Sequence, residues 1–187
     1  MKLKIIKFKS VKSTNDVAIK LIRSNKHLSG LVTTYSQTKG RGTMGKKWIS
    51  YKGNIFISIF FKVNLIKIKI ESFLKINAKI IKKILNEYTK KIIKIKKPND
   101  LLIDGKKICG ILQEVIEYKK EKYLIAGIGI NTKISTVNKN FKYTSLEINS
   151  HKSVSNEIII NKIKKNYDKL IYDINNKNFL YVKKMYK

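Results

Sequence analysis

The pair Asp104-Gly105 constrains the fold of this chain most, because it lies between two runs of strand-forming residues. An Asp-Gly pair in such a setting is a strong signal for a β-hairpin, since both residues tolerate the positive φ of a tight turn. Leu101 to Ile103 precede the pair and Lys107 to Tyr118 follow it. A third run covers Tyr123 to Ile130. The sequence therefore predicts an antiparallel meander in the second half of the chain.

The other apolar segments add strands and helices to this meander. Alternating or continuous apolar residues predict strands, and apolar residues at helical spacing predict helices. On this basis we predict further strands over Lys2 to Phe8, Leu31 to Tyr35, Ile55 to Val63 and Ile92 to Ile95, and helices over Val17 to Ile22, Phe73 to Tyr88 and Ile158 to Ile174. This order predicts a single α+β domain over residues 1–187, with a mixed, largely antiparallel sheet and helices against one face.

The charge of the chain is strongly positive. Its 187 residues include 42 Lys and Arg against 12 Asp and Glu, a formal net charge of +30, which is compatible with nucleic-acid binding. Only Arg23 and Arg41 are arginines, however, and arginine is the residue that binds phosphate and guanine through two parallel hydrogen bonds. The composition favours a generally lysine-rich surface, and a basic nucleic-acid-binding module stays as the alternative.

The sequence carries no sign of export or membrane insertion. Its longest apolar run, Ile55 to Phe61, is far shorter than the ~20 residues of a membrane span. Charged residues interrupt the first ten positions, so they do not form the apolar core of a secretory signal. Cys109 is the only cysteine, which excludes an internal disulfide. We expect a cytoplasmic protein with no membrane partner.

Glycines and one arginine gather in the loop from Gly40 to Lys47. The spacing nearly matches a P-loop, but Lys47 stands where Ser or Thr would bind Mg²⁺. The glycines still allow backbone N–H groups to converge on an anion, and Arg41 adds a permanently charged fork. An ordinary flexible loop explains the same residues equally well.

Two further groups of residues are candidates for chemistry. Lys107 can present a charge to a phosphate or carboxylate, and Asp100 can hold Mg²⁺ on a phosphate. Gly127 and Gly129 leave room for a ligand against their strand, although core packing explains them as well. The two histidines form no metal-ligand spacing and no Ser-His-acid group. The residues alone indicate a cytosolic enzyme of nucleotide or acyl-phosphate chemistry.

Five motifs, taken in order, resemble those of biotin–protein ligases. They are Ser13-Thr14-Asn15, QTKGRGTMGKKW at 37–48, KKPND at 96–100, KICGIL at 107–112 and GIGIN at 127–131. Thr144-Ser145-Leu146 fits as well, and the likeness runs from about Lys2 to Ile174. The resemblance implies the class II synthetase-like catalytic domain that biotin and lipoate ligases share.

The resemblance implies an AMP-forming ligase reaction in two steps. The biotin carboxylate attacks the α-phosphate of MgATP and gives biotinyl-5′-AMP and pyrophosphate. A lysine of a biotin carboxyl carrier protein, such as that of acetyl-CoA carboxylase, then attacks the mixed anhydride and releases AMP. Such catalysis works by positioning and charge neutralisation, so no enzyme nucleophile is needed.

The resemblance also assigns roles to residues. Lys107 and Arg41 fall on catalytic positions, and Asp100 falls on the side of the Mg²⁺ ion. The implied biotin site consists of Ser13, Thr14, Asn15, Gln37, Gly40, Arg41, Gly42, Lys107, Gly110, Gly127 and Gly129. The implied ATP and adenylate site consists of Arg41, Gly42, Thr43, Trp48, Asn99, Asp100, Lys107 and Asn131.

The chain departs from the family pattern at three positions. Thr43 and Lys46 replace two arginines of the family loop, so we expect a looser hold on the adenylate. Lys97 replaces the tryptophan of the usual KWPND motif and removes an aromatic contact.

The ends of the chain and the family together set the remaining expectations. The first motif leaves no room for a DNA-binding helix-turn-helix, so no specific DNA binding is expected, and too little chain follows Ile174 for a C-terminal β-barrel. A homodimer is compatible with the family. The nearest alternative is a lipoate–protein ligase, which uses the same adenylate chemistry.

Overall fold

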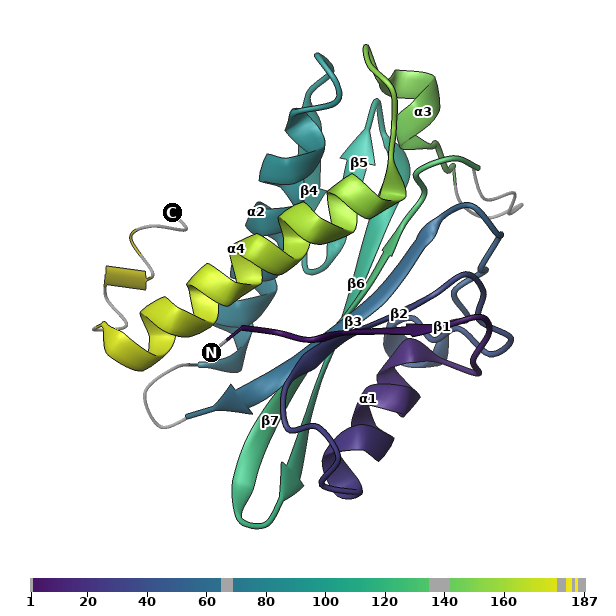
Figure 1. Cartoon of the computed structure of the whole chain (residues 1–187). Coiled ribbons are helices and arrows are strands. Elements are labelled where there is room, and N and C mark those ends of the chain that lie inside the picture. Colours follow the sequence, from purple (N-terminus) through teal and green to yellow (C-terminus); the bar gives the residue numbers. More distant parts are fainter. Residues whose placement is uncertain (1, 65–68, 135–141, 178–180, 183, 185–187) are drawn as a thin grey trace.

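The computed structural model describes residues 2–64, 69–134, 142–177, 181, 182 and 184. Seven strands form one sheet in the order β1-β2-β3-β7-β6-β5-β4 (Figure 1). β1 and β2 are parallel, and all other neighbouring strands are antiparallel, which confirms the mixed, largely antiparallel sheet. The strands are Ile5–Phe8 (β1), Gly30–Thr34 (β2), Ile55–Val63 (β3), Ile93–Lys96 (β4), Asp100–Ile103 (β5), Lys106–Tyr118 (β6) and Glu121–Ile130 (β7).

The predicted Asp104-Gly105 turn joins β5 to β6. Asp104 has a φ of 49° and Gly105 a φ of 74°, which is the left-handed region that this pair tolerates. β6 then pairs with β7 over ten residue positions, and Gly110 lies opposite Gly129 in this register. The meander is therefore confirmed, and its two longest strands lie at the centre of the sheet beside β3.

Two long helices cover one face of the sheet. These are α2 (Ile70–Asn86) and α4 (Asn156–Asn176), and they pack on alternate residues of β3 such as Ile57 and Ile59. Full burial of an aliphatic side chain contributes roughly 1.5–3 kcal/mol, so this layer is the main source of stability. A short helix, α3 (Leu146–Asn149), lies outside the predicted elements.

The first helix lies on the opposite face. α1 (Thr14–Arg23) packs Ala18 and Ile22 against Phe60 and Ile125, whose side chains point away from α2 and α4. Figure 1 shows the sheet running between α1 and the α2–α4 pair. The expectation of helices on one face is therefore corrected for α1. An apolar stripe shows that a helix is buried but not which face of a sheet it covers.

Candidate functional site

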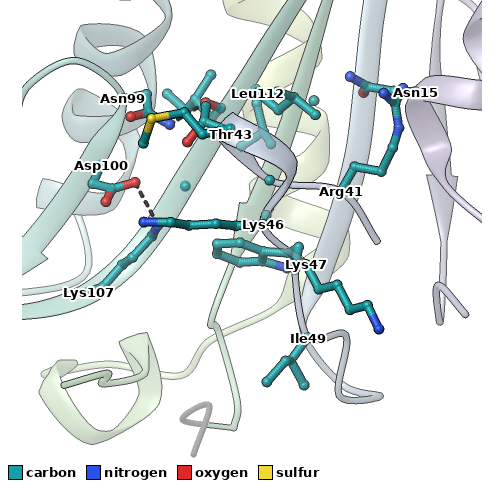
Figure 2. Close-up of a pocket in the computed structure, with 18 of the residues that line it drawn as sticks. Asn15, Arg41, Thr43, Lys46, Lys47, Ile49, Asn99, Asp100, Lys107 and Leu112 are labelled. Atoms are coloured by element: carbon teal, nitrogen blue, oxygen red, sulfur yellow. Dashed lines mark hydrogen bonds and ion pairs between the residues drawn. The ribbon is translucent and has the colours of Figure 1, made fainter. Parts of the chain in front are cut away.

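A cavity of about 650 Å³ opens beside the N-terminal end of α1, where the five motifs converge. Every residue of the implied biotin and ATP sites lines it except Gly40 and Asn131. Polar and charged residues without an assigned role also line it: Lys46, Lys47, Lys96, Lys97 and Tyr143. Figure 2 shows Lys107 and Asp100 at one end of the cavity and Arg41 with Asn15 at the other.

The glycines of β6 and β7 provide close approach for protein side chains. A Cβ on Gly129 would lie 2.4 Å from Cε2 of Trp48, and one on Gly110 would lie 2.6 Å from Cζ3 of the same ring. A Cβ on Gly127 would lie 2.3 Å from Oδ1 of Asn15. The indole therefore lies directly on the facing pair Gly110 and Gly129, and a larger residue at either position would displace it.

Lys107 and Asp100 form an ion pair at one end of the cavity. Their Nζ and Oδ1 atoms are 2.7 Å apart, and the side chains are 19% and 21% exposed. The Lys107 ammonium also lies 5.3 Å from the centre of the Trp48 ring, within the range of a cation–π contact. Two backbone hydrogen bonds fix the position of Lys107 on its strand. Its N–H donates to the carbonyl of Lys142, and its carbonyl accepts from the N–H of Thr144. The two candidates that the sequence offered, Lys107 and Asp100, thus contact each other directly.

Tyr143 borders this end of the cavity without any signal in the motifs. Burial raises the pKa of its phenol, and the negative charge of Asp100 raises it further. The hydroxyl therefore keeps its proton at neutral pH and can donate a hydrogen bond.

Arg41 lies at the other end and binds two carboxylates. Its Nη1 and Nη2 atoms donate to Oε1 and Oε2 of Glu114 at 2.9 and 2.7 Å, and Nη2 lies 2.9 Å from Oδ1 of Asp16. Burial acts to lower the pKa of Arg41, but the hydrogen bond and charge of Glu114, aided by Asp16, outweigh it and raise this pKa. Both terminal nitrogens of the guanidinium, Nη1 and Nη2, are thus bound to carboxylates.

The loop that carries Arg41 closes on itself. The N–H of Gly42 donates to the carbonyl of Lys46 at 2.7 Å, and the N–H of Trp48 donates to Gly40 at 2.9 Å. Gly42 has an extended backbone, and its N–H is used inside the loop, so it does not join an anion-binding set of the kind that the glycine spacing suggested. Gly40 does not line the cavity, and a Cβ on it would lie 2.4 Å from the carbonyl oxygen of Trp48.

A polar network joins the start of α1 to β3. The backbone N–H and the hydroxyl of Thr14 both donate to Oε1 of Gln37, at 2.8 and 3.1 Å. Ser58, which is fully buried, bonds the Thr14 hydroxyl at 2.7 Å and also bonds Oδ1 of Asn15. The sequence analysis did not identify Ser58 as a site residue. The available signal was its position as the polar residue within the apolar run Ile55 to Phe61.

The comparisons with known proteins agree with this geometry. The model of the biotin/lipoate A/B protein ligase family matches residues 7–131. This chain belongs to that family. The bifunctional ligase/repressor BirA of Bacillus subtilis is 35% identical over 121 residues, which are 64% of this chain and 37% of that relative. The chain therefore matches little more than a third of its curated relative.

Solved structures of the family match most of the chain. The biotin protein ligase of Aquifex aeolicus in complex with biotin and ATP has a TM-score of 0.75 and 27% identity, covering 94% of this chain and 73% of that chain. The biotin protein ligase of Leishmania major in complex with biotin has a TM-score of 0.72 and 26% identity, and the match covers 86% of this chain and 71% of that chain. A lipoate protein ligase of Thermoplasma acidophilum shares the fold at 11% identity, with a TM-score of 0.61 and coverage of 92% and 84%.

Two family positions lie outside or beside the cavity. Asn131 is fully buried and does not line the cavity, and its side-chain Oδ1 accepts from Nδ2 of Asn54 at 3.5 Å. Asn99 lines the cavity, but its amide is held by the carbonyl of Ile111 at 2.9 Å. Cys109 faces the apolar layer of α2 and α4, and burial raises the pKa of its thiol, which favours the protonated form.

The described residues offer limited ligands for a metal. No three His, Cys, Asp or Glu side chains among them come together as a metal-binding group. Asp100 supplies one carboxylate at the cavity, which suits Mg²⁺ because this ion takes most of its other ligands from water and substrate phosphates. In the same described part of the chain, no helix has the length and apolar character required to cross a membrane.

Proposed function

We propose that this member of the biotin/lipoate ligase family activates biotin with ATP and transfers it to a lysine of a biotin carboxyl carrier protein. In the first step a biotin carboxylate oxygen attacks the α-phosphorus, and the bond to the leaving pyrophosphate breaks. In the second step the amine of the carrier lysine attacks the biotinyl carbonyl, loses a proton, and AMP leaves.

The observation that carries this proposal is the cavity that brings both catalytic candidates together with the polar network. Thr14 and Gln37 offer fixed hydrogen-bonding groups for the ring of biotin, and Lys107 offers a charge for the carboxylate and the α-phosphate. Four lysines at positions 46, 47, 96 and 97 line the same cavity and favour a polyphosphate electrostatically. A similar chain from Aquifex aeolicus is described in complex with biotin and ATP.

The two catalytic candidates of the cavity are already paired with carboxylates, and an anionic substrate must compete with these carboxylates. Lys107 is bound to Asp100 and Arg41 to Glu114 and Asp16, so an incoming anion shares or replaces a carboxylate partner. Lys107 is the residue that neutralises the negative charge that develops between carboxylate and phosphate. Asp100, once released, would hold Mg²⁺, which supplies charge neutralisation on the phosphates.

The proposed partner is an acidic carrier domain in the cytoplasm. The net charge of +30 speeds the encounter with an acidic protein at low ionic strength, and no specific DNA binding is part of the proposal.

Exchange of labelled pyrophosphate into ATP tests the first half-reaction. Purified protein is incubated with biotin, with lipoate, or with neither acid, and a Lys107→Ala variant is run beside it. We expect exchange that depends on biotin and is lost in the variant. Exchange with lipoate alone would assign the chain to the lipoate branch of the family. No exchange with either acid, together with salt-dependent nucleic-acid binding that survives Lys107→Ala, would favour the basic binding module.

A further inference from the structure

The ion pairs of Arg41 reach from its loop to two other elements. Glu114 lies on β6 and Asp16 lies in the first turn of α1, so the guanidinium bridges the loop, the sheet and the helix. The pair with Glu114 has the two parallel N–H···O bonds that make arginine–carboxylate contacts strong and directional. The backbone bonds of the loop, by contrast, join Gly42 to Lys46 and Gly40 to Trp48, and so close the loop on itself.

Glu114 also fixes a residue of the proposed biotin site. Nδ2 of Asn15 donates to Oε2 of Glu114 at 2.6 Å, and Oδ1 of Asn15 bonds the Ser58 hydroxyl. A carboxylate can only accept, so the amide must turn its NH₂ group to Glu114 and its carbonyl to Ser58. Glu114 therefore connects the loop to the polar network.

The position of Glu114 on the strand explains how it reaches both groups. β6 alternates, so Gly110, Leu112 and Glu114 share the face that carries the cavity, while Cys109 and Ile111 face α2 and α4. Gly110 contacts the ring of Trp48, which directly follows the Gly40–Lys47 loop that carries Arg41. The loop is thus fixed at one end by contact with glycines and at the other by Glu114.

We propose that Glu114 is a positioning residue that binds Arg41, holds the Gly40–Lys47 loop over the cavity, and so retains biotin and the adenylate. This inference rests on the proposed function. Glu114 touches no reacting atom: it acts through Arg41 and Asn15. Removing its charge is therefore expected to weaken retention of the substrates and to leave the chemical step intact.

Hydrogen exchange of the backbone tests the hold on the loop without any substrate. Glu114→Gln keeps an oxygen for Asn15 and removes the charge that binds Arg41. Glu121→Gln is the matched control, because Glu121 pairs with Lys62 at 2.7 Å at the far end of the same hairpin. In Glu114→Gln we expect the amides of Gly42 and Trp48 to exchange about fivefold faster, as for the loss of a partly exposed ion pair, with no change in the control. Unchanged exchange in Glu114→Gln would overturn the proposal.

Pyrophosphate exchange supplies a second, independent readout. For Glu114→Gln we expect the KM for biotin to rise about fivefold, with kcat within about twofold of wild type. Because Glu114→Gln keeps an oxygen for Asn15 and loses only the charge that binds Arg41, adding it to Arg41→Gln should have no further effect. A fall in kcat at unchanged KM, or additive effects in the double variant, would contradict this role. If the wild-type protein shows no pyrophosphate exchange, the proposed function is rejected. Hydrogen exchange of the backbone would still show whether Glu114 holds the Gly40–Lys47 loop.

Discussion

The same strands present different residues on the two faces of the sheet: apolar core residues on one face and residues of the cavity on the other. On the face of α2 and α4, the alternate residues of β3 and β7 are apolar and buried, as Ile59 and Ile128 are. On the face of α1, the residues between them include Ser58, Gly127 and Gly129, which contact polar or aromatic side chains of the cavity. The α2–α4 face therefore carries the larger apolar core, and the α1 face, which has a smaller one, gives up apolar contacts at its glycines to accommodate a site.

This difference explains why glycines occur in the centre of long strands. Gly in a strand interior weakens the strand because it packs no side chain. Gly129 nevertheless lies opposite Gly110 in the middle of the sheet, where the neighbouring apolar layer compensates for the loss. We expect substitutions at the cavity-lining positions of the α1 face to change function and substitutions in the apolar layer under α2 and α4 to change stability.

Lys107→Ala should give the largest effect on activity. It removes the charge that neutralises the reacting carboxylate and phosphate, and we expect kcat/KM for pyrophosphate exchange to fall about 10³-fold. Lys106→Ala, at the exposed neighbouring position, should leave exchange within about twofold, the small effect usual for surface substitutions. Equal losses in both variants would remove Lys107 from the reacting centre.

Ile59→Ala should separate the two faces most clearly. The side chain is fully buried under α2 and α4, so its truncation is expected to lower the free energy of unfolding by about 3 kcal/mol. Urea denaturation measures this loss. The KM for biotin of the folded fraction should be unchanged, and a shifted KM would mean that the two faces are coupled.

Gly129→Ala should affect the site with little effect on the fold. Its new Cβ would collide with the Trp48 ring, so the indole must move, and we expect kcat/KM to fall about tenfold, as for a loss of about 1.4 kcal/mol. Gly105→Ala is the matched control. Its Cβ meets no atom, but its φ of 74° strains alanine, so it should lower the thermal midpoint and leave kcat/KM unchanged. The opposite pattern would refute the role of the glycine pair.

Thr43→Arg should give the smallest effect. Thr43 lines the cavity where the family loop often carries arginine, and a cation there would hold the adenylate phosphate more firmly. We expect release of free biotinyl-5′-AMP to slow about threefold, within the range of a partly exposed charge contact. Equal rates of release, measured by chromatography of the filtrate, would show that Thr43 does not weaken retention.

Most of the fold could be predicted from local sequence. The Asp104-Gly105 pair became the predicted turn between β5 and β6, and the runs of Ile55 to Val63 and Tyr123 to Ile130 became strands with nearly the predicted bounds. The side of α1 could not be predicted, because it depends on which face of the sheet is left uncovered by other helices. The short helix α3 carries too few residues for a periodic signal.

The site was predictable as a set of positions and not as a set of contacts. The motifs placed Arg41, Trp48 and Lys107 at one cavity, but their partners are distant in sequence. Glu114, which binds Arg41 from 73 residues away, belongs to no motif, and the contact of Trp48 with facing glycines depends on strand register. Such pairings come from tertiary structure and leave no local pattern.

The indole on the glycine pair gives this protein an optical probe of its own. Trp48 is the only tryptophan in the chain, so light at the red edge of protein absorption excites a single site, which lies in the cavity. A ligand that moves the ring or alters its contact with the Lys107 ammonium changes the emission of the whole protein. Titrations of biotin and of ATP can therefore be followed separately, without a label and without a carrier protein.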